Sequence, residues 1–367
     1  MRVILTGGGT GGHVYPALAV ARYIKKKEPR ADILFVGTER GLESRIVSSA
    51  GFKLKTITVR GLPRKLSPEL FKAFADLTRG GLEARTILKE FQPQAVLGTG
   101  GYVCGPVVLW SSLLGIPSLI HEQNVIPGVT NKILSRLVKK ICVSFDASKK
   151  HFPASKEKVV VTGNPRASEV LGPSREDGIK ALRLNPNKKS VLIVSGSRGA
   201  EKINRCILEI LLDFKARSDL QFIYITGQEY YEKASGTARK KGAIPAENIF
   251  LVPYFEEMPL ALAAADLIIS RAGATTLAEI TARGIPAILV PSPNVTNNHQ
   301  VLNARVLSDA GAAEIIMEDK LTGSFLKEKI FHLINNEKNL TEMSAKSKEL
   351  GRPDSVDLIY RLLKEYI

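Results

Sequence analysis

Short apolar runs rich in β-branched residues alternate with amphipathic helical segments along almost the whole chain. The runs have the length of buried strands, and the segments between them have the apolar spacing of helices that cover a sheet. The expected strands lie near residues 2–6, 32–37, 53–59, 94–98, 117–121, 139–144, 157–162, 189–195, 220–226, 248–252, 266–270, 286–290 and 312–316. This alternation predicts an α/β fold with parallel sheets, whose ligands bind at the carboxyl ends of the strands.

The strands form two series, and each series opens on a strand, a glycine-rich turn and a helix. The first turn is Gly7-Gly8-Gly9-Thr10-Gly11-Gly12-His13, and the second is Ser195-Gly196-Ser197-Arg198-Gly199-Ala200. A chain of 367 residues is long enough for two domains. We therefore expect two Rossmann-like domains with a cleft between them, at residues 1–163 and 164–340, because Gly163-Asn164-Pro165 breaks regular structure. An amphipathic helical segment at 341–367 is expected to cross back to the first domain.

The first glycine-rich turn has the features of a phosphate site. Glycines allow close approach of a ligand to backbone amides, and the following helix points its partly positive end at the turn. His13 adds a titratable imidazole. The spacing of Gly7, Gly9 and Gly12 also satisfies the dinucleotide fingerprint. An NAD oxidoreductase is therefore an alternative, although Glu39 stands late for the acidic residue that such a site needs.

Polar residues follow two further strands of the first half. Tyr102 lies in another glycine-rich turn, where its hydroxyl is able to face a ligand. His121-Glu122-Gln123-Asn124 ends a strand, and four polar side chains there are costly to bury without partners, so we expect them to face a ligand. We do not expect them to bind a metal, because no second histidine stands at ligand spacing.

In the second half, the small-residue turn Ala272-Gly273-Ala274-Thr275-Thr276 follows a strand and opens a helix. Its amides suit a phosphate, and Glu279 one turn later suits a ribose diol, with a helix-capping role as the alternative. Asn297-Asn298-His299-Gln300 begins another helix and offers carboxamides to sugar hydroxyls. Because no Asp-x-Asp occurs, we expect a leaving diphosphate to be stabilised by helix ends, Ser197 and Arg166 rather than by a divalent metal.

The formal net charge of +16 favours anionic partners. The loop at 60–66 mixes basic and apolar residues, among them Arg60, Arg64, Lys65 and Leu66, and Lys72 follows in the next helix. That helix also carries Phe71 and Phe74, and Trp110 lies in another helix of the same half. The pattern predicts contact with an anionic membrane surface, with core packing as the alternative for the two phenylalanines. Widely spaced cysteines predict a reducing compartment, and neither a signal peptide nor a membrane-spanning segment is expected.

Taken together, these residues resemble the MurG family of glycosyltransferases from Met1 to about Ile367. The motifs that carry the resemblance are Gly8-Gly9-Thr10-Gly11-Gly12-His13, Gly100-Gly101-Tyr102, His121-Glu122-Gln123-Asn124, Gly163-Asn164-Pro165 and the segment from Arg271 to Glu279. The resemblance implies a GT-B fold and an inverting, metal-independent enzyme without a cofactor. It implies transfer of N-acetylglucosamine from UDP-N-acetylglucosamine (UDP-GlcNAc) to the 4-hydroxyl of the MurNAc of undecaprenyl-diphospho-MurNAc-pentapeptide, at the cytoplasmic face of the membrane. The implied processes are peptidoglycan synthesis, cell shape and cell division, with no nucleic-acid partner.

The resemblance also implies the roles of individual residues. The implied donor-contact positions are Asn124, Arg166, Ser197, the backbone of Phe255, Ala274, Thr275, Thr276, Glu279 and Gln300. The turn with Thr10, Gly11 and Gly12, together with Tyr102, is expected to face the lipid-linked acceptor. The general base stays open between His13 and Glu122.

Three positions depart from the family pattern, since Arg198 stands where a glutamine is frequent, Ala272 where a serine is usual, and His299 where some members carry a glutamine. Two alternative functions also fit some of these residues. A GT-B UDP-sugar 2-epimerase has the same fold and nucleotide, and a non-catalytic nucleotide-binding subunit would recruit a partner to the membrane.

Overall fold

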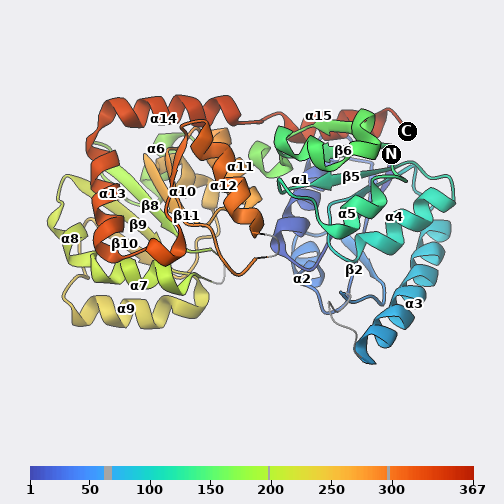
Figure 1. The fold of residues 1–367 in the computed structure, drawn as a ribbon, viewed down its shortest axis with the longest axis horizontal. Helices are drawn as coiled ribbons and strands as arrows, with labels where there is room; N and C mark the ends of the chain where they lie inside the picture. The colour runs from blue at the N-terminus through green and yellow to red at the C-terminus, as the bar shows by residue number, and fades with distance from the viewer. Residues whose placement is uncertain (62–67, 197–198, 296–297) are drawn as a thin grey trace. The chain divides into compact units, whose positions relative to one another are not determined.

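The computed structural model of the chain describes residues 1–61, 68–196, 199–295 and 298–367 (Figure 1). It divides into two compact units, of which one contains Met1–Ser168 with Pro353–Ile367 and the other Glu169–Arg352. The expected domains ended at 163 and 340, whereas the units change at 168 and 352. Helix α14 (Glu337–Leu350) therefore belongs to the second unit, and helix α15 (Ser355–Lys364) belongs to the first.

The first unit is built on a seven-stranded parallel sheet with the strand order β3-β2-β1-β4-β5-β6-β7. Its strands are β1 (Arg2–Thr6), β2 (Asp32–Gly37), β3 (Lys53–Thr56), β4 (Ala95–Gly98), β5 (Ser118–Glu122), β6 (Lys140–Val143) and β7 (Val159–Val161). Successive side chains of a strand point to opposite faces of its sheet. Accordingly, Val3 and Leu5 pack in the core on one face, and Ile4 packs in the core on the other.

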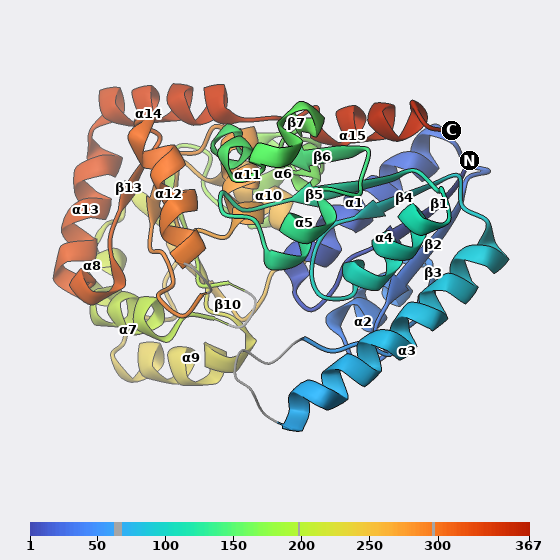
Figure 2. The ribbon, with the colours of Figure 1, turned by 45° about the vertical axis from the view of Figure 1, so that its right-hand side comes forward.

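Helices cover both faces of this sheet. They are α1 (Gly11–Lys27), α2 (Leu42–Ser49), α3 (Pro68–Phe91), α4 (Cys104–Leu113), α5 (Val129–Leu134) and α15, with the 3-10 helices η1 (Asp146–His151), η2 (Pro153–Lys158) and η3 (Pro165–Ser168). The core on one face takes side chains from α1, α2 and α15, and the core on the other takes them from α3, α4 and α5. Helix α3 packs against α4, and α4 packs against α5 (Figure 2).

Helix α15 is fixed to α1 by apolar and polar contacts. Ile359 and Leu363 are fully buried in the core beneath α1. The Lys364 ammonium and the Tyr360 hydroxyl both donate to Glu28, over 2.9 and 2.8 Å, and these contacts lower the pKa of Glu28. The Tyr23 hydroxyl donates to Asp357 in the same way. The end of the chain is therefore part of the first unit.

The second unit contains a six-stranded parallel sheet with the order β10-β9-β8-β11-β12-β13. Its strands are β8 (Lys189–Val194), β9 (Leu220–Ile225), β10 (Ile249–Val252), β11 (Leu267–Ser270), β12 (Ala287–Leu289) and β13 (Ala313–Ile315). Its helices are α6 (Arg175–Ala181), α7 (Glu201–Glu209), α8 (Leu211–Ala216), α9 (Tyr231–Lys240), α10 (Met258–Ala264), α11 (Ala274–Arg283), α12 (His299–Asp309), α13 (Gly323–Asn335) and α14, with η4 (Gln228–Tyr230) and η6 (Glu318–Lys320).

The two sheets confirm the predicted fold class, since each unit is a parallel, Rossmann-like α/β layer structure of the GT-B type. Every expected strand is present, and the one expected at 53–59 ends at Thr56. Within the described ranges, the structure contains no helix that is both long and apolar enough to cross a membrane.

Candidate active site

The first glycine-rich turn joins β1 to α1 and orients His13. Helix α1 starts at Gly11. Among the described residues, no side chain makes a capping hydrogen bond at its N-terminus. The half-buried imidazole places Nδ1 2.9 Å from the Gly8 carbonyl oxygen and 3.3 Å from the Thr10 hydroxyl. A carbonyl oxygen only accepts, so Nδ1 carries the hydrogen in this contact. The other ring nitrogen, Nε2, then has a lone pair that is able to accept a proton.

The turn after β4 fits closely around this histidine. A Cβ on Gly100 would lie 2.8 Å from Cδ2 of His13, and a Cβ on Gly101 would lie 2.3 Å from the Gly8 carbonyl oxygen. Both glycines have positive φ, at 108° and 84°, which a residue with a side chain rarely adopts. The Tyr102 ring lies against Gly9, so the structure brings Tyr102 to the first glycine-rich turn as expected for neighbouring strand ends.

The motif at the end of β5 turns mainly inward. His121, Glu122 and Gln123 are all at most 2% exposed, whereas Asn124 is half-buried. The expectation that all four side chains face a ligand stays a prediction, and the three buried ones make hydrogen bonds within the first unit. Burial lowers the pKa of His121 to about 4, and its Nε2 donates to the Gly163 carbonyl over 2.9 Å. Gln123 donates to His121 Nδ1 and to the Thr99 carbonyl, which ties β5 to β4.

The Glu122 carboxylate organises the loop that follows it. One oxygen accepts from the Asn124 amide over 3.0 Å, and the other accepts from the Gly128 amide and the Asn131 side chain over 3.0 and 2.8 Å. Neutral donors of the loop thus surround this carboxylate. In η3, the Arg166 guanidinium lies 5.5 Å from the centre of the Tyr15 ring, on the first turns of α1.

The second unit places its predicted residues at the carboxyl ends of β10, β11 and β12. Helix α11 starts at Ala274 after the N-cap Gly273, which has no side chain to cap it, so the first amides of the helix are not occupied by a cap. Thr275 and Thr276 are half-buried at this end, and Glu279 is 8% exposed on the next turn. Phe255 follows β10 and packs edge-on against Phe250.

Gln300 lies in the first turn of α12, and its Oε1 accepts from the Ser292 amide over 2.9 Å. Because this contact fixes the carboxamide, its NH₂ group is the part available to a ligand. Ser197 and Asn297, which are predicted to contact the donor, and Arg198, which departs from the family pattern, lie outside the described residues.

Sequence reasoning missed two residues that hold these loops in place. Arg271 donates to the carbonyls of Val290 and Pro291 and pairs with Glu318, so one guanidinium joins the loops after β11, β12 and β13. Glu43 lies beneath the first glycine-rich turn and is 1% exposed. The signal for Glu43 is the pair of glycines, Gly37 and Gly41, that leaves room for its side chain.

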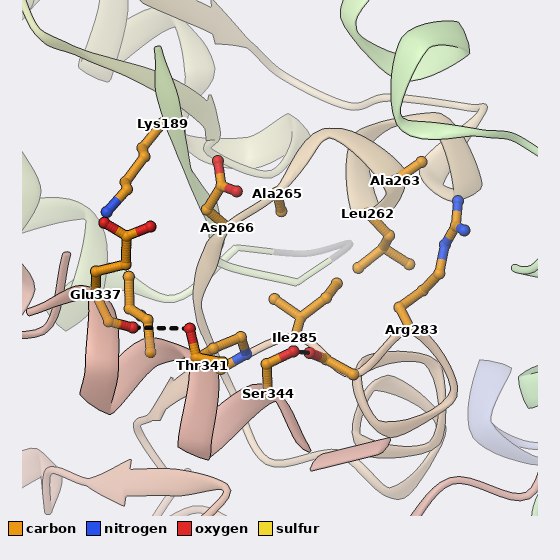
Figure 3. Close-up of a pocket in the computed structure, with 13 residues that line it drawn as sticks. Lys189, Leu262, Ala263, Ala265, Asp266, Arg283, Ile285, Glu337, Thr341 and Ser344 are labelled. Carbon is orange, nitrogen blue, oxygen red and sulfur yellow. Dashed lines mark hydrogen bonds between the residues drawn. The ribbon is translucent and has the colours of Figure 1, made fainter. Parts of the chain in front are cut away.

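A cavity of about 350 Å³ lies elsewhere in the second unit (Figure 3). It is found at the amino ends of β8, β11 and β12, with Lys189, Asp266 and Ser344 in its wall. The Arg175 guanidinium already pairs with Asp266 through two contacts of 2.9 Å. The cavity is thus at the opposite end of β11 from Ala274 and contains no predicted site residue. In the part of the chain that the structure describes, no cluster of histidine, cysteine and acidic side chains suits a metal.

Family models match both units. Residues 3–143 match the N-terminal domain of glycosyltransferase family 28, and residues 190–359 match its C-terminal domain. The chain belongs to glycosyltransferase family 28. The first match covers strands β1 to β6 and the loops with His13, Tyr102 and Glu122, and the second covers the loops with Ala274, Glu279 and Gln300. Strand β7 and Arg166 lie between the two matches.

Relatives within the family match over their full length. Proteins of Bacillus licheniformis and Bacillus subtilis strain 168 are 48% and 46% identical over 365 residues, covering 100% of this chain and 98% and 99% of theirs. Each is named UDP-N-acetylglucosamine--N-acetylmuramyl-(pentapeptide) pyrophosphoryl-undecaprenol N-acetylglucosamine transferase. The crystal structure of Acinetobacter baumannii MurG is 32% identical, covers 99% of both chains and has a TM-score of 0.78. A UDP-GlcNAc 2-epimerase from Neisseria meningitidis, at 15% identity and a TM-score of 0.70, shares the fold alone.

Proposed function

We propose that this chain transfers N-acetylglucosamine from UDP-GlcNAc to the 4-hydroxyl of the MurNAc in undecaprenyl-diphospho-MurNAc-pentapeptide, the step that forms the completed disaccharide unit of peptidoglycan. The observation that carries the proposal is the full-length match, at 46–49% identity, to relatives that bear the name of this activity. The family 28 domains and the similarity to a MurG structure agree with it.

We assign the donor chiefly to loops of the second unit. The amides of Ala274, Thr275 and Thr276 open α11 without a side-chain cap, and an uncapped helix N-terminus attracts a diphosphate. The Glu279 carboxylate, one turn further along, accepts from the ribose hydroxyls. The remaining proposed donor contacts are Ser197, Phe255 through its backbone, Gln300, Asn124 and Arg166, and the proposed acceptor contacts are Thr10, Gly11, Gly12 and Tyr102.

We assign the general base to His13. As the acceptor 4-hydroxyl oxygen forms a bond to C1 of the donor sugar, Nε2 of His13 takes the hydroxyl proton. The bond from C1 to the diphosphate oxygen breaks, and UDP leaves with the electron pair. Attack from the face opposite UDP inverts the anomeric centre. The structure favours His13 over Glu122, because donors of its own loop surround the Glu122 carboxylate.

We further propose that the outer face of α3, α4 and α5 contacts the cytoplasmic surface of an anionic membrane, where the lipid-linked acceptor lies. Phe71 is 82% exposed, and Phe74 is also exposed, so core packing does not explain them. The other exposed apolar residues on these helices and just beyond are Leu82, Leu109, Leu113, Val129, Ile133 and Leu137. Exposed basic residues stand among them, including Lys72, Arg79, Lys132, Arg136 and Lys139.

This surface differs from the one expected from the sequence. The loop with Arg64, Lys65 and Leu66 lies outside the described residues, and Arg60 is paired with Asp76. Apolar side chains interleaved with bases are the pattern of proteins that lie on anionic bilayers. The proposed surface therefore extends from α3 over α4, of which sequence reasoning named only Trp110, to α5, which it did not name.

The test of the function uses purified protein, UDP-GlcNAc labelled in the sugar, and a lipid-linked MurNAc-pentapeptide acceptor. We expect the label to enter the lipid product, and free UDP to form in equal amount. Label that appears as a second UDP-sugar without entering lipid would instead indicate an epimerase. If UDP-GlcNAc binds but neither product forms, the protein is a non-catalytic binding subunit.

A further inference from the structure

Glu43 is a buried carboxylate that the proposed chemistry does not use. The buried carboxylates of the described residues are Glu43, Glu122 and Glu279, and the roles proposed above account for the other two. Glu43 stands in the first turn of α2, and its side chain extends beneath the glycine-rich turn after β1. Burial of a carboxylate is costly unless donors satisfy its oxygens, so such a group needs an explanation.

Three neutral donors hold the Glu43 carboxylate. Oε1 accepts from the Thr38 amide over 2.9 Å and from the Thr38 hydroxyl over 2.6 Å. Oε2 accepts from the Gly9 amide over 3.2 Å. A Cβ on Gly8, Gly37 or Gly41 would approach the Glu43 side chain to 2.6 Å or less. Glycines on two loops therefore form the slot that this side chain fills.

The Gly9 amide that Glu43 holds belongs to the same peptide unit as the Gly8 carbonyl. In a planar trans peptide the N–H and the C=O point in opposite directions. Glu43 therefore binds one side of the Gly8–Gly9 peptide, and His13 Nδ1 binds the other side over 2.9 Å. The carboxylate, the peptide and the imidazole thus form one continuous series of hydrogen bonds.

We propose that Glu43 is a positioning residue that acts on His13 through this single peptide. The role rests on the proposed function, in which Nε2 of His13 is the base. By holding the Gly9 amide, Glu43 keeps the Gly8 carbonyl directed at Nδ1–H, and this contact leaves the lone pair on Nε2. Hydrogen bonds in series polarise one another, so the carboxylate also strengthens the carbonyl as an acceptor when the imidazole takes up the acceptor proton. The acceptor proton remains on Nε2 and is not passed along the series.

The kinetic test compares the wild type with Glu43→Gln, His13→Ala and the double variant. In Glu43→Gln the carboxamide oxygen is expected to keep the two Thr38 donors, which leaves the NH₂ group facing the Gly9 amide. The series is then broken at Gly9 with little change in volume. We expect Glu43→Gln to lower kcat by about 10- to 100-fold, as loss of an orienting partner does elsewhere, with KM for UDP-GlcNAc unchanged. In the His13→Ala background the same change should lower kcat by less than about twofold, since partners in one network are not additive. If Glu43→Gln lowers kcat by the same factor in the wild-type and in the His13→Ala background, the proposal is overturned. A general loss of activity from a damaged fold would give this result.

Glu83→Gln is the matched control. Glu83 also accepts from the amide and the hydroxyl of one threonine, Thr58, and it lies in the same unit. Among the described residues the hydrogen bonds of Glu83 reach Thr58 and Arg79 and not the glycine-rich turn, so we expect its variant to keep the wild-type kcat.

A second readout does not depend on turnover. In protein labelled with ¹⁵N in histidine, the ring nitrogens report which one carries the hydrogen, and a His13→Gln variant assigns the signal. We expect the Nδ1–H form to dominate in the wild type and the two forms to mix in Glu43→Gln. An unchanged ratio in an active enzyme would refute the role of Glu43 and leave the transferase function intact. If the wild type has no transferase activity but the ratio of the two His13 forms still changes in Glu43→Gln, the hydrogen-bond series is supported and the proposed function is refuted.

Discussion

Replacing Leu113, Val129 and Ile133 together by serine should weaken binding to anionic membranes. The three side chains lie on the neighbouring helices α4 and α5. Val129 and Ile133 are four residues apart, so they share one face of α5. The described part of the chain leaves them mostly uncovered, since they are 65, 72 and 64% exposed, respectively. Serine keeps the charge unchanged, and the variant therefore isolates the apolar contribution.

The size of the effect follows from the exposed fraction. Full burial of a Val, Leu or Ile side chain is worth roughly 1.5–3 kcal/mol. Covering about two-thirds of each side chain therefore contributes about 1–2 kcal/mol, and about 3–6 kcal/mol for the three together. Since 1.4 kcal/mol is a factor of ten, complete insertion would make the partition coefficient of the variant about 10²- to 10⁴-fold lower.

Flotation with vesicles that contain phosphatidylglycerol measures this partition coefficient directly. The control is Leu212→Ser on α8, because Leu212 is also half exposed but belongs to the second unit. Its binding should equal that of the wild type. Unchanged binding of the triple variant, or an equal loss in the control, would show that another surface contacts the membrane. Raising the salt concentration should weaken the residual binding of the triple variant, because its bases remain.

Glu279→Ala should weaken UDP binding at least about tenfold by calorimetry, because loss of a charge-assisted hydrogen bond costs about 1.5–3 kcal/mol; unchanged affinity would remove Glu279 from the site. His13→Ala should lower kcat about 10²- to 10⁴-fold with UDP affinity retained, and should abolish the acidic limb of the pH–rate profile. If that limb persists in His13→Ala and vanishes in Glu122→Gln, the carboxylate is the base. The free energy of unfolding should fall by about 3 kcal/mol between pH 6.5 and pH 4, because the pKa of His121 is about 4 when folded and the unfolded chain binds the proton first. Urea unfolding of His121→Gln should lack this decrease, and an identical pH dependence would contradict it.

The fold was predictable because buried parallel strands leave a strong pattern in the sequence. Runs such as residues 267–269 are apolar throughout, and turns and helices of different composition separate them. The terminal segment was less predictable. Its amphipathic pattern covers α14 and α15 alike, but α14 packs on α11, whereas α15 packs on α1. Which surface receives an apolar helix face depends on tertiary contacts that periodicity does not encode.

The loops of the site were predictable in position but not in the direction of each side chain. The rule that ligands bind at the carboxyl ends of parallel strands located residues such as His13, Tyr102 and Glu279. It said nothing of Glu43, because this residue comes from the first turn of a helix and reaches the loop from beneath. The sequence does contain Gly37 and Gly41, the glycines that make room for this carboxylate, but their spacing alone does not indicate which side chain fills the space.

The inward turn of His121, Glu122 and Gln123 has a physical reason. In a loop at the end of a buried strand, backbone amides and carbonyls have no partners in the sheet. They therefore require hydrogen bonds from nearby polar side chains, just as the polar groups of a bound ligand do. Glu122 supplies acceptors to the loop that follows it, and His121 supplies a donor to Gly163 on the loop after β7. Glu43 does the same for Thr38 and Gly9. Polar residues at such an edge therefore fall into two groups, those that hold the loops and those that meet the substrate. The hydrogen bonds within the protein account for the carboxylate of Glu43 and the imidazole nitrogens of His121, whereas those of His13 account for Nδ1 alone. We therefore propose that His13, with its lone pair on Nε2, belongs to the second group.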